Sequence, residues 1–162
     1  MGLRWFTATV LLVVAAIIGL RFKSYRPFNL SVLALLALNG VVGVCKLVIG
    51  RTKPRLYVDE LHANGMSYPS GHASNAILTW GLFACLSVKY SAPSRFRTNL
   101  AISTVSAITV LVVLISLFRN THWLSDLVGG VSIGTALLLL IVAIDRVISS
   151  RRLAPVIEVQ RT

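Results

Sequence analysis

Charged side chains are scarce in this sequence. Only 13% of the 162 residues are Asp, Glu, Lys or Arg, whereas about a quarter is usual in a soluble protein. This deficit is too large for a water-exposed surface, and 56% of the residues are hydrophobic. The composition therefore excludes a soluble globular domain and predicts a single integral membrane domain.

Acidic residues are particularly few. Five Asp and Glu stand against 16 Lys and Arg, which gives a net charge of +11. In a membrane protein such an excess usually reports loop orientation and contact with anionic lipid headgroups. The chain has no basic face interleaved with aromatic residues, so nucleic acid is not an expected partner.

Cysteine is nearly absent as well. Cys45 and Cys85 both fall inside apolar runs. In the topology predicted below they lie near opposite faces of the bilayer, too far apart for a disulfide. We expect two buried free thiols, which say nothing about the redox compartment.

Long apolar runs make up most of the chain. Five of them are long enough to span a bilayer, at about 5–22, 28–49, 70–88, 99–118 and 124–148. The first is interpreted as a spanning helix, because it is too long for a signal peptide and no small-x-small cleavage site follows it. The sequence predicts an all-α integral membrane bundle of about five helices. Residues 1–149 form its single domain and 150–162 a basic cytoplasmic tail.

Small residues recur within two of the runs. Gly40 and Gly43 lie in the middle of the second run, and Gly130 and Gly134 in the fifth. This spacing is typical of helices that pack closely in membranes, which we predict at both places. Lys46 is different, because a charge in the last turns of a spanning helix is either functional or reaches to the interface.

Basic residues are unequally divided between the two membrane faces. Five spans place the end of the second run, the start of the third and the turn between the fourth and fifth on one face. That face carries six basic residues: Arg4, Lys46, Arg51, Lys53, Arg55 and Arg119. The opposite face carries ten: Arg21, Lys23, Arg26, Lys89, Arg95, Arg97, Arg146, Arg151, Arg152 and Arg161. The positive-inside rule then predicts that the first face and the N-terminus lie outside the cytoplasm.

A polar motif opens the third run. Residues 68–75 read Tyr-Pro-Ser-Gly-His-Ala-Ser-Asn, and Ser70 is predicted to cap the helix that follows. Unpaired backbone N–H groups at a helix start attract phosphate. His72 at the same point can exchange a proton near neutral pH. The plain alternative is a capped helix start with an incidental histidine.

Two further stretches share that face. Lys46 and Lys53 are seven residues apart, so they lie on one side of a helix if the helix continues that far. His122 and Asp126 are spaced i, i+4, so on a helix the carboxylate reaches one ring nitrogen and leaves Nε2 as a nucleophile. Asp126 alone could merely cap a helix start. The three stretches together favour a catalytic site.

These residues resemble the pattern of a known family. Lys-x6-Arg-Pro, then Pro-Ser-Gly-His, then Ser-Arg-x5-His-x3-Asp marks the type 2 phosphatidic acid phosphatase superfamily, the lipid phosphate phosphatases. The sequence is similar to it at Lys46, Lys53-Pro54, 69–72 and His122 with Asp126, over about residues 46–134. It looks closest to small bacterial members of five or six helices, so five helices would be a six-helix core that lacks one.

The resemblance implies phosphoryl transfer without a metal or other cofactor. His122 would attack phosphorus to form a phosphohistidine, Asp126 would orient it, and His72 would protonate the leaving oxygen. The phosphate ligands that it implies are Lys46, Lys53, Ser70 and the Gly71 amide. It also implies a lipid phosphate or (poly)prenyl diphosphate substrate in the cell inner membrane, with the site facing outside the cytoplasm. It gives no oligomeric state.

The arginine pattern departs from the family's. Lys53 replaces an arginine, which exchanges a planar fork for a point charge. The Ser-Arg position reads Ile115-Ser116, so the second arginine is missing there. Arg119 lies one turn on and is predicted to substitute for it, the alternative being an interfacial anchor.

Four other polar or aromatic residues lie near the motifs, and two of them have alternative interpretations. Arg51 and Arg55 are either additional phosphate contacts or part of a solvated basic loop. His62 is interpreted as a loop histidine, and Trp123 as an interfacial aromatic residue.

Three rival functions stay open. A catalytically silent family member would bind lipid headgroups or partner proteins; the altered arginines favour it and the retained His72, His122 and Asp126 oppose it. A small transporter or channel subunit would place ionisable groups at mid-membrane, where Asn39 is the main polar residue. The soluble vanadate haloperoxidases share the anion-pocket chemistry, but five spanning runs argue against them.

Overall fold

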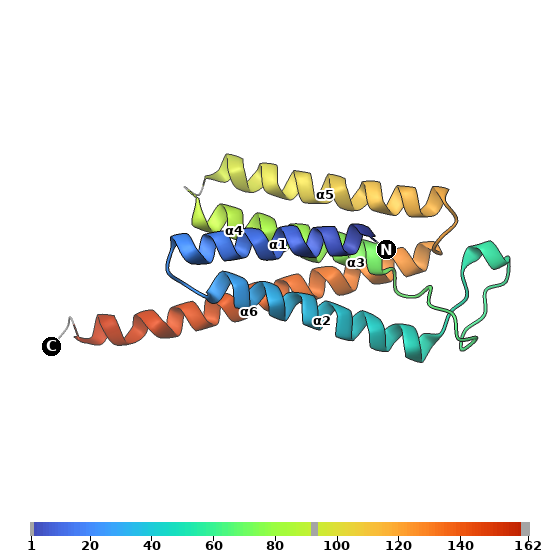
Figure 1. Cartoon of the computed structure of the whole chain (residues 1–162), viewed down its shortest axis with the longest axis horizontal. Coiled ribbons are helices and arrows are strands. Elements are labelled where there is room, and N and C mark those ends of the chain that lie inside the picture. The colour runs from blue at the N-terminus through green and yellow to red at the C-terminus, as the bar shows by residue number, and fades with distance from the viewer. Residues whose placement is uncertain (1, 92–93, 160–162) are drawn as a thin grey trace.

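The computed structural model describes residues 2–91 and 94–159 and is a bundle of helices, with no strand in these ranges (Figure 1). The elements are α1 (Gly2–Arg21), α2 (Arg26–Ile49), the short η1 (Pro54–Leu56), α3 (Gly71–Asn75), η2 (Ala76–Trp80), α4 (Gly81–Tyr90), α5 (Arg95–Phe118) and α6 (Leu124–Val159). The predicted all-α fold is confirmed.

Three stretches of helix in the described ranges are long and apolar enough to cross a membrane: Arg26–Leu56, Arg95–Phe118 and Leu124–Ser149. Trp5–Arg21 is a shorter apolar helix. Large apolar side chains on the outside of the bundle, such as Leu20 and Phe118, are more than 80% exposed to solvent. Such a surface suits hydrocarbon, where helices satisfy their own backbone groups.

The third predicted helix is not regular. α3, η2 and α4 follow one another without a break from Gly71 to Tyr90, and η2 is a π-helical turn. Asn75, at its start, donates from Nδ2 to Thr7 Oγ1 of α1 at 2.8 Å and accepts from Thr79 Oγ1 at 3.0 Å. All three side chains are buried. A π turn is rare and is often found beside functional residues, and here it begins after the short α3 that contains His72 of the Pro-Ser-Gly-His motif.

The backbone of α6 extends beyond its predicted end. It continues to Val159 through most of the segment predicted to be a basic tail, and it projects past the other helices (Figure 1). Residues 160–162 of that predicted tail lie outside the described residues.

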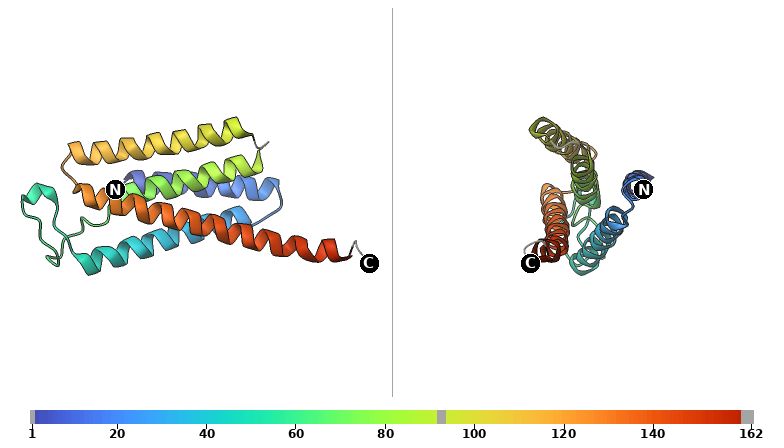
Figure 2. Two further views of the ribbon diagram at one scale, coloured as in Figure 1. Left: turned by 180° about the vertical axis from the view of Figure 1, so that it is seen from behind. Right: turned by 90° about the vertical axis from the view of Figure 1, so that its left-hand side faces the viewer.

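Apolar side chains from five helical elements form the core. Its buried members are Leu11, Ala15, Ala34, Leu38, Val42, Leu78, Leu82, Leu86 and Ile141. They come from α1, α2, η2, α4 and α6, whereas α5 lies beside α4 at the edge of the bundle (Figures 1 and 2). The core thus holds together the helices that position the polar motifs.

Close packing occurs at one of the two predicted glycine pairs. A Cβ added at Gly130 would lie 2.5 Å from Ser70 O, and one at Gly134 would lie 2.6 Å from Ser74 O. The backbone of α6 therefore contacts that of α3 directly. At Gly40 and Gly43 an added Cβ would meet no described atom within 4 Å. The prediction of close packing was wrong there, because that face of α2 has no neighbour in the described chain.

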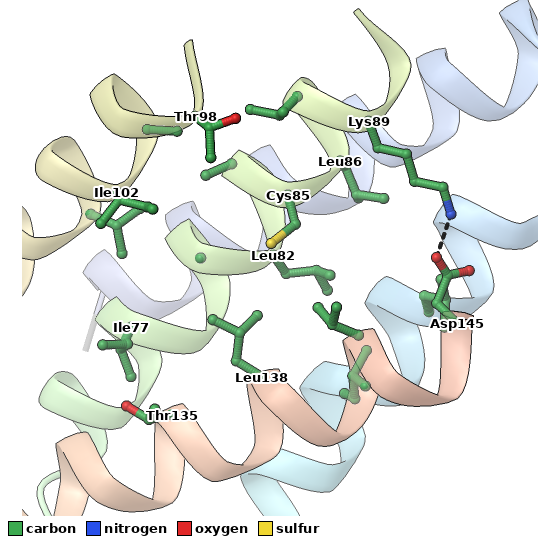
Figure 3. A pocket seen from close by; sticks show the side chains of 18 of the residues that line it. Ile77, Leu82, Cys85, Leu86, Lys89, Thr98, Ile102, Thr135, Leu138 and Asp145 are labelled. Atoms are coloured by element: carbon green, nitrogen blue, oxygen red, sulfur yellow. Dashed lines mark hydrogen bonds and ion pairs between the residues drawn. The ribbon is translucent and has the colours of Figure 1, made fainter. Parts of the chain in front are cut away.

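Both cysteines are free. Cys45 is half-buried, but Cys85 is exposed, so the predicted burial was wrong for Cys85. Its side chain points into a groove between α4, α5 and α6 (Figure 3).

Candidate active site

Asp126 is the buried centre of the polar motifs. It lies in the first turn of α6 with no exposed surface. Its Oδ2 accepts hydrogen bonds from Trp123 N at 3.0 Å and from Ser67 Oγ. Its Oδ1 accepts from Arg51 Nη1 at 2.8 Å. Asp126 therefore does cap its helix, as the plain alternative proposed, but it also binds two groups from the loop 50–70, which links α2 to α3.

His122 lies beside this carboxylate. It precedes α6 rather than belonging to it, so the predicted i, i+4 contact is not made along one helix. Its Nδ1 is nevertheless 3.5 Å from Asp126 Oδ2, and the side chain is 9% exposed. Nδ1 has no hydrogen-bond partner in the described part of the chain. Because an unpaired buried nitrogen costs free energy, a small rotation that completes the bond to Asp126 would be favourable.

The Pro-Ser-Gly-His motif is joined to the same turn of α6. Ser70 N donates to Asp126 O at 2.8 Å. Ser70 Oγ accepts from Ala73 N at 3.4 Å, which confirms the predicted helix cap. Ser70 and Gly71 are buried and His72 is exposed. The first turns of α3 and α6 thus bring two of the three motifs together.

Arg51 connects the loop 50–70 to this centre. Its Nη1 donates to Ser125 Oγ at 2.6 Å as well as to Asp126. Its Nε and Nη2 each donate to the Asp59 carboxylate at 2.6 Å. The guanidinium lies 5.4 Å from the centre of the Trp123 ring and its side chain is 14% exposed. The structure therefore places Arg51 inside the site rather than on a solvated loop.

Further polar contacts fix the position of the loop 50–70. The Arg51 guanidinium holds the pKa of the Asp59 carboxyl below its usual value. Thr52 N donates to Glu60 O and Glu60 N to Thr52 Oγ1, both at 3.0 Å. Trp123 is half-buried, and its Nε1 donates to Thr52 O at 3.1 Å. Trp123 therefore holds the loop against the start of α6.

Lys46 and Lys53 are not aligned on one helix. α2 ends at Ile49, where Gly50 adopts a left-handed conformation (φ 54°) and donates its N–H to Lys46 O. The two lysines were predicted to share a helix face if the helix continued to Lys53, and this condition is not met, because glycine at this position ends the helix. Lys46 Nζ donates to Met66 O, whereas Lys53 is exposed in the loop before η1.

Ser116 stands where the family has its second arginine, and Arg119 is the predicted substitute for that arginine. Ser116 is buried and its Oγ donates to Val112 O of its own helix at 2.7 Å. Arg119 ends α5 and is exposed. Arg55 donates to the Arg119 carbonyl from Nε at 3.2 Å and from Nη2 at 3.0 Å. Arg55 therefore holds the turn that precedes His122.

His62 belongs to the loop 50–70. Its Nδ1 lies 3.1 Å from Val48 O at the end of α2, and the side chain is exposed. This agrees with its interpretation as a loop histidine.

Sequence reasoning missed three polar residues of this site: Ser67, Asp59 and Ser125. Ser67 is fully buried and donates to Asp126. No periodicity distinguishes it from the other polar residues of the loop, so only the folded loop reveals it. In the described ranges no three His, Cys, Asp or Glu side chains gather closely enough to hold a metal ion.

Comparison with known proteins gives three matches. The model of the PAP2 superfamily matches residues 27–148. Phosphatidylglycerophosphatase B of Bacillus subtilis (strain 168) is 28% identical over 109 residues, which are 67% of this chain and 53% of that protein. The chain thus spans about half the length of this curated relative.

A solved structure is also similar. It is described as the crystal structure of the first transmembrane PAP2 type phosphatidylglycerolphosphate phosphatase from Bacillus subtilis. It has 26% sequence identity and a TM-score of 0.66, and the match covers 90% of this chain and 74% of that one. Since the family model covers about three quarters of the sequence, including every motif described above, the chain belongs to the PAP2 superfamily.

Proposed function

We propose that the protein is a membrane phosphatase that hydrolyses a lipid phosphate or a (poly)prenyl diphosphate through a phosphohistidine, without a metal ion. One observation carries the proposal. The buried Asp126 lies 3.5 Å from His122 Nδ1 and accepts from Arg51, while its carbonyl accepts from Ser70 N. A histidine beside a buried carboxylate and next to a helix start suits attack on a phosphate.

The first step forms the phosphohistidine. His122 Nε2 attacks phosphorus, and the bond from phosphorus to the leaving oxygen breaks, which is the ester oxygen of a lipid phosphate or the bridging oxygen of a diphosphate. His72 donates a proton to that oxygen as it leaves. Asp126 stabilises the positive charge that develops on the His122 ring, because its carboxylate faces Nδ1.

The second step releases phosphate. Water attacks phosphorus, the phosphorus–nitrogen bond breaks, and His72 accepts the proton from the water. His122 returns to its neutral form beside Asp126. Each proton that His72 gives in the first step is thus recovered in the second.

Donors around phosphorus would stabilise its oxygens in both steps. The proposed ligands are Lys46, Lys53, Ser70, the Gly71 amide and Arg119. Fixed donors of this kind typically supply the largest share of the rate in phosphoryl transfer. Arg51 is held by two carboxylates, so we assign it to positioning Asp126 rather than to phosphate.

The substrate class follows from the membrane setting and the relatives. The name of the Bacillus relative states that it acts on phosphatidylglycerophosphate, which supports a phospholipid phosphate here. Prenyl diphosphates stay within the proposal, since their terminal phosphate presents the same group to His122. We place the reaction in the cell inner membrane, on the side away from the cytoplasm.

The test is phosphate release by the purified protein in detergent with EDTA. Phosphatidylglycerol phosphate, phosphatidic acid and a prenyl diphosphate are supplied in turn to wild type, His122→Ala and His62→Ala. We expect release by wild type and His62→Ala and at least a thousandfold loss in His122→Ala, because the nucleophile itself is removed. An acid-labile phosphoprotein should form only when His122 is present.

Three outcomes would contradict the proposal. Equal release by His122→Ala would exclude the histidine mechanism. Activity that EDTA abolishes and a divalent ion restores would exclude the metal-free one. No release from any lipid by a folded protein would favour the silent, headgroup-binding alternative.

A further inference from the structure

A groove of about 800 Å³ lies between α4, α5 and α6, largely away from the candidate active site (Figure 3). Leu82 and Cys85 of α4, Ile102 of α5 and Leu138 of α6 form its walls. It continues to the end of the bundle where α4 finishes, which is opposite the loop 50–70 (Figure 1).

Polar and apolar groups are segregated along this groove. Its walls are mostly apolar, whereas Lys89, Asp145, Arg146 and Ser149 gather at the end near Tyr90. Figure 3 shows Lys89 and Asp145 together at that end. An amphiphile with one polar head has the same division, and neither a polar metabolite nor a wholly apolar molecule does.

The charge at the polar end is positive. Asp145 accepts from Arg26 Nη2 at 3.0 Å and from Lys89 Nζ. Arg146 is the next residue and also lines the groove. Arg26, Lys89 and Arg146 carry three positive charges against the one negative charge of Asp145, which leaves a net charge of +2 at this end. Lys89, at 43% side-chain exposure, is accessible to a ligand.

The length of the groove suits one lipid leaflet. From Asp145 at the polar end to Thr135 at the other end, its lining on α6 extends over about 15 Å at the rise of an α-helix. Half of the hydrocarbon core of a bilayer is about 15 Å thick. An acyl chain anchored by its headgroup at Lys89 would thus lie along the apolar wall for its whole length.

We propose that this groove binds one anionic phospholipid, with its headgroup phosphate at Lys89 and Arg146 and an acyl chain along Leu82 and Leu138. The excess of positive charge favours an anionic headgroup over a zwitterionic one. The site is separate from the candidate active site and does not depend on the proposed phosphatase activity.

The test compares phosphatidylserine with phosphatidylcholine, neither of which has a phosphate monoester. Delipidated full-length His122→Ala protein is mixed with each lipid at equal concentration, and bound lipid is counted by native mass spectrometry. We expect at least a fivefold preference for one phosphatidylserine. Lys89→Gln/Arg146→Gln should remove this preference, because both proposed headgroup contacts lose their charge.

Two further variants keep the test specific. Arg21→Gln/Arg95→Gln removes the same charge at the same end but outside the groove, and it should keep the preference. Ala101→Phe fills the α5 wall of the groove and should reduce retention of both lipids at least fivefold, with helicity unchanged by circular dichroism.

The proposal would be overturned by equal retention of the two lipids, or by loss of the preference in the Arg21/Arg95 control. A lipid-free dimer that Ala101→Phe abolishes would assign the groove to a second copy of the chain instead, and would also overturn it.

Discussion

Arg51 joins carboxylates from two separate parts of the chain, Asp59 in the loop and Asp126 in α6. Asp126 is fully buried, so it needs a nearby cation to keep its charge at low cost. The same guanidinium lies against Trp123, which also binds the loop through Thr52 O. Loop position and carboxylate orientation therefore depend on one side chain.

Replacement of Arg51 should disturb the proposed catalysis. In Arg51→Gln the buried Asp126 loses its cation, so phosphate release should fall by about tenfold to a hundredfold, or about 1.4–3 kcal/mol. Arg21→Gln is the matched control, because it removes the same charge from an exposed residue at the opposite end of the bundle. Initial rates of both variants test this, and an equal loss in both would contradict the positioning role.

Single-residue roles were partly readable from the sequence. The spacing of His122 and Asp126 predicted their proximity, although His122 lies before the helix and not on it, and Ser70 was predicted correctly as a helix cap. Arg51 could not be separated from Arg55, because their order in the loop does not say which of them turns inward. Ser67 was missed because a buried serine in a loop has no pattern of its own.

At the scale of elements, contact between α3 and α6 holds the two halves of the candidate site together. Gly130 allows the α6 backbone to approach Ser70 O, and Gly134 allows it to approach Ser74 O. Overpacking at such a contact typically costs about 1–3 kcal/mol. Here the displaced atoms would include the cap of the Pro-Ser-Gly-His helix.

Gly130→Ala should therefore lower both the thermal midpoint in detergent and the rate of phosphate release. Its Cβ would lie 2.5 Å from Ser70 O, so α3 must move away from Asp126. Gly43→Ala makes the same chemical change where nothing described lies within 4 Å. It should be neutral or slightly stabilising, since alanine favours a helix over glycine. Equal midpoints for the two variants would contradict the packing argument.

Helix boundaries show where sequence patterns stop being informative. Hydrophobic runs placed α1, α2, α5 and α6 to within a few residues at most ends. The end of α2 at Ile49 was predicted correctly, and the left-handed Gly50 that ends it keeps Lys46 and Lys53 from sharing a helix face. The π turn was not foreseen, since it depends on how Asn75 meets Thr7 of another helix.

For the molecule as a whole, composition and run length were enough to predict an all-helical membrane protein. The lateral spacing of helices was not predictable, because it depends on which faces pack. The groove beside α5 and the open face of α2 at Gly40 and Gly43 were consequently missed.

Orientation in the membrane is a prediction for the whole molecule. The excess of basic residues at the end opposite the candidate site favours that end in the cytoplasm. In a background without Cys45 and Cys85, Tyr57→Cys in the exposed loop should react with an impermeant maleimide in intact cells. Ser91→Cys, beyond α4, should react only after permeabilisation. The reverse labelling would place the site in the cytoplasm.

The π turn in η2 changes the direction in which side chains of the third span point before and after it. Compared with an uninterrupted α-helix, one inserted residue rotates everything after it by about 100° about the helix axis. Leu82 and Leu86, after the turn, belong to the buried core, while His72, before the turn, is exposed. The end that carries the Pro-Ser-Gly-His motif and the end that packs into the core can thus each adopt their own rotation about the helix axis, which a single regular helix would not allow.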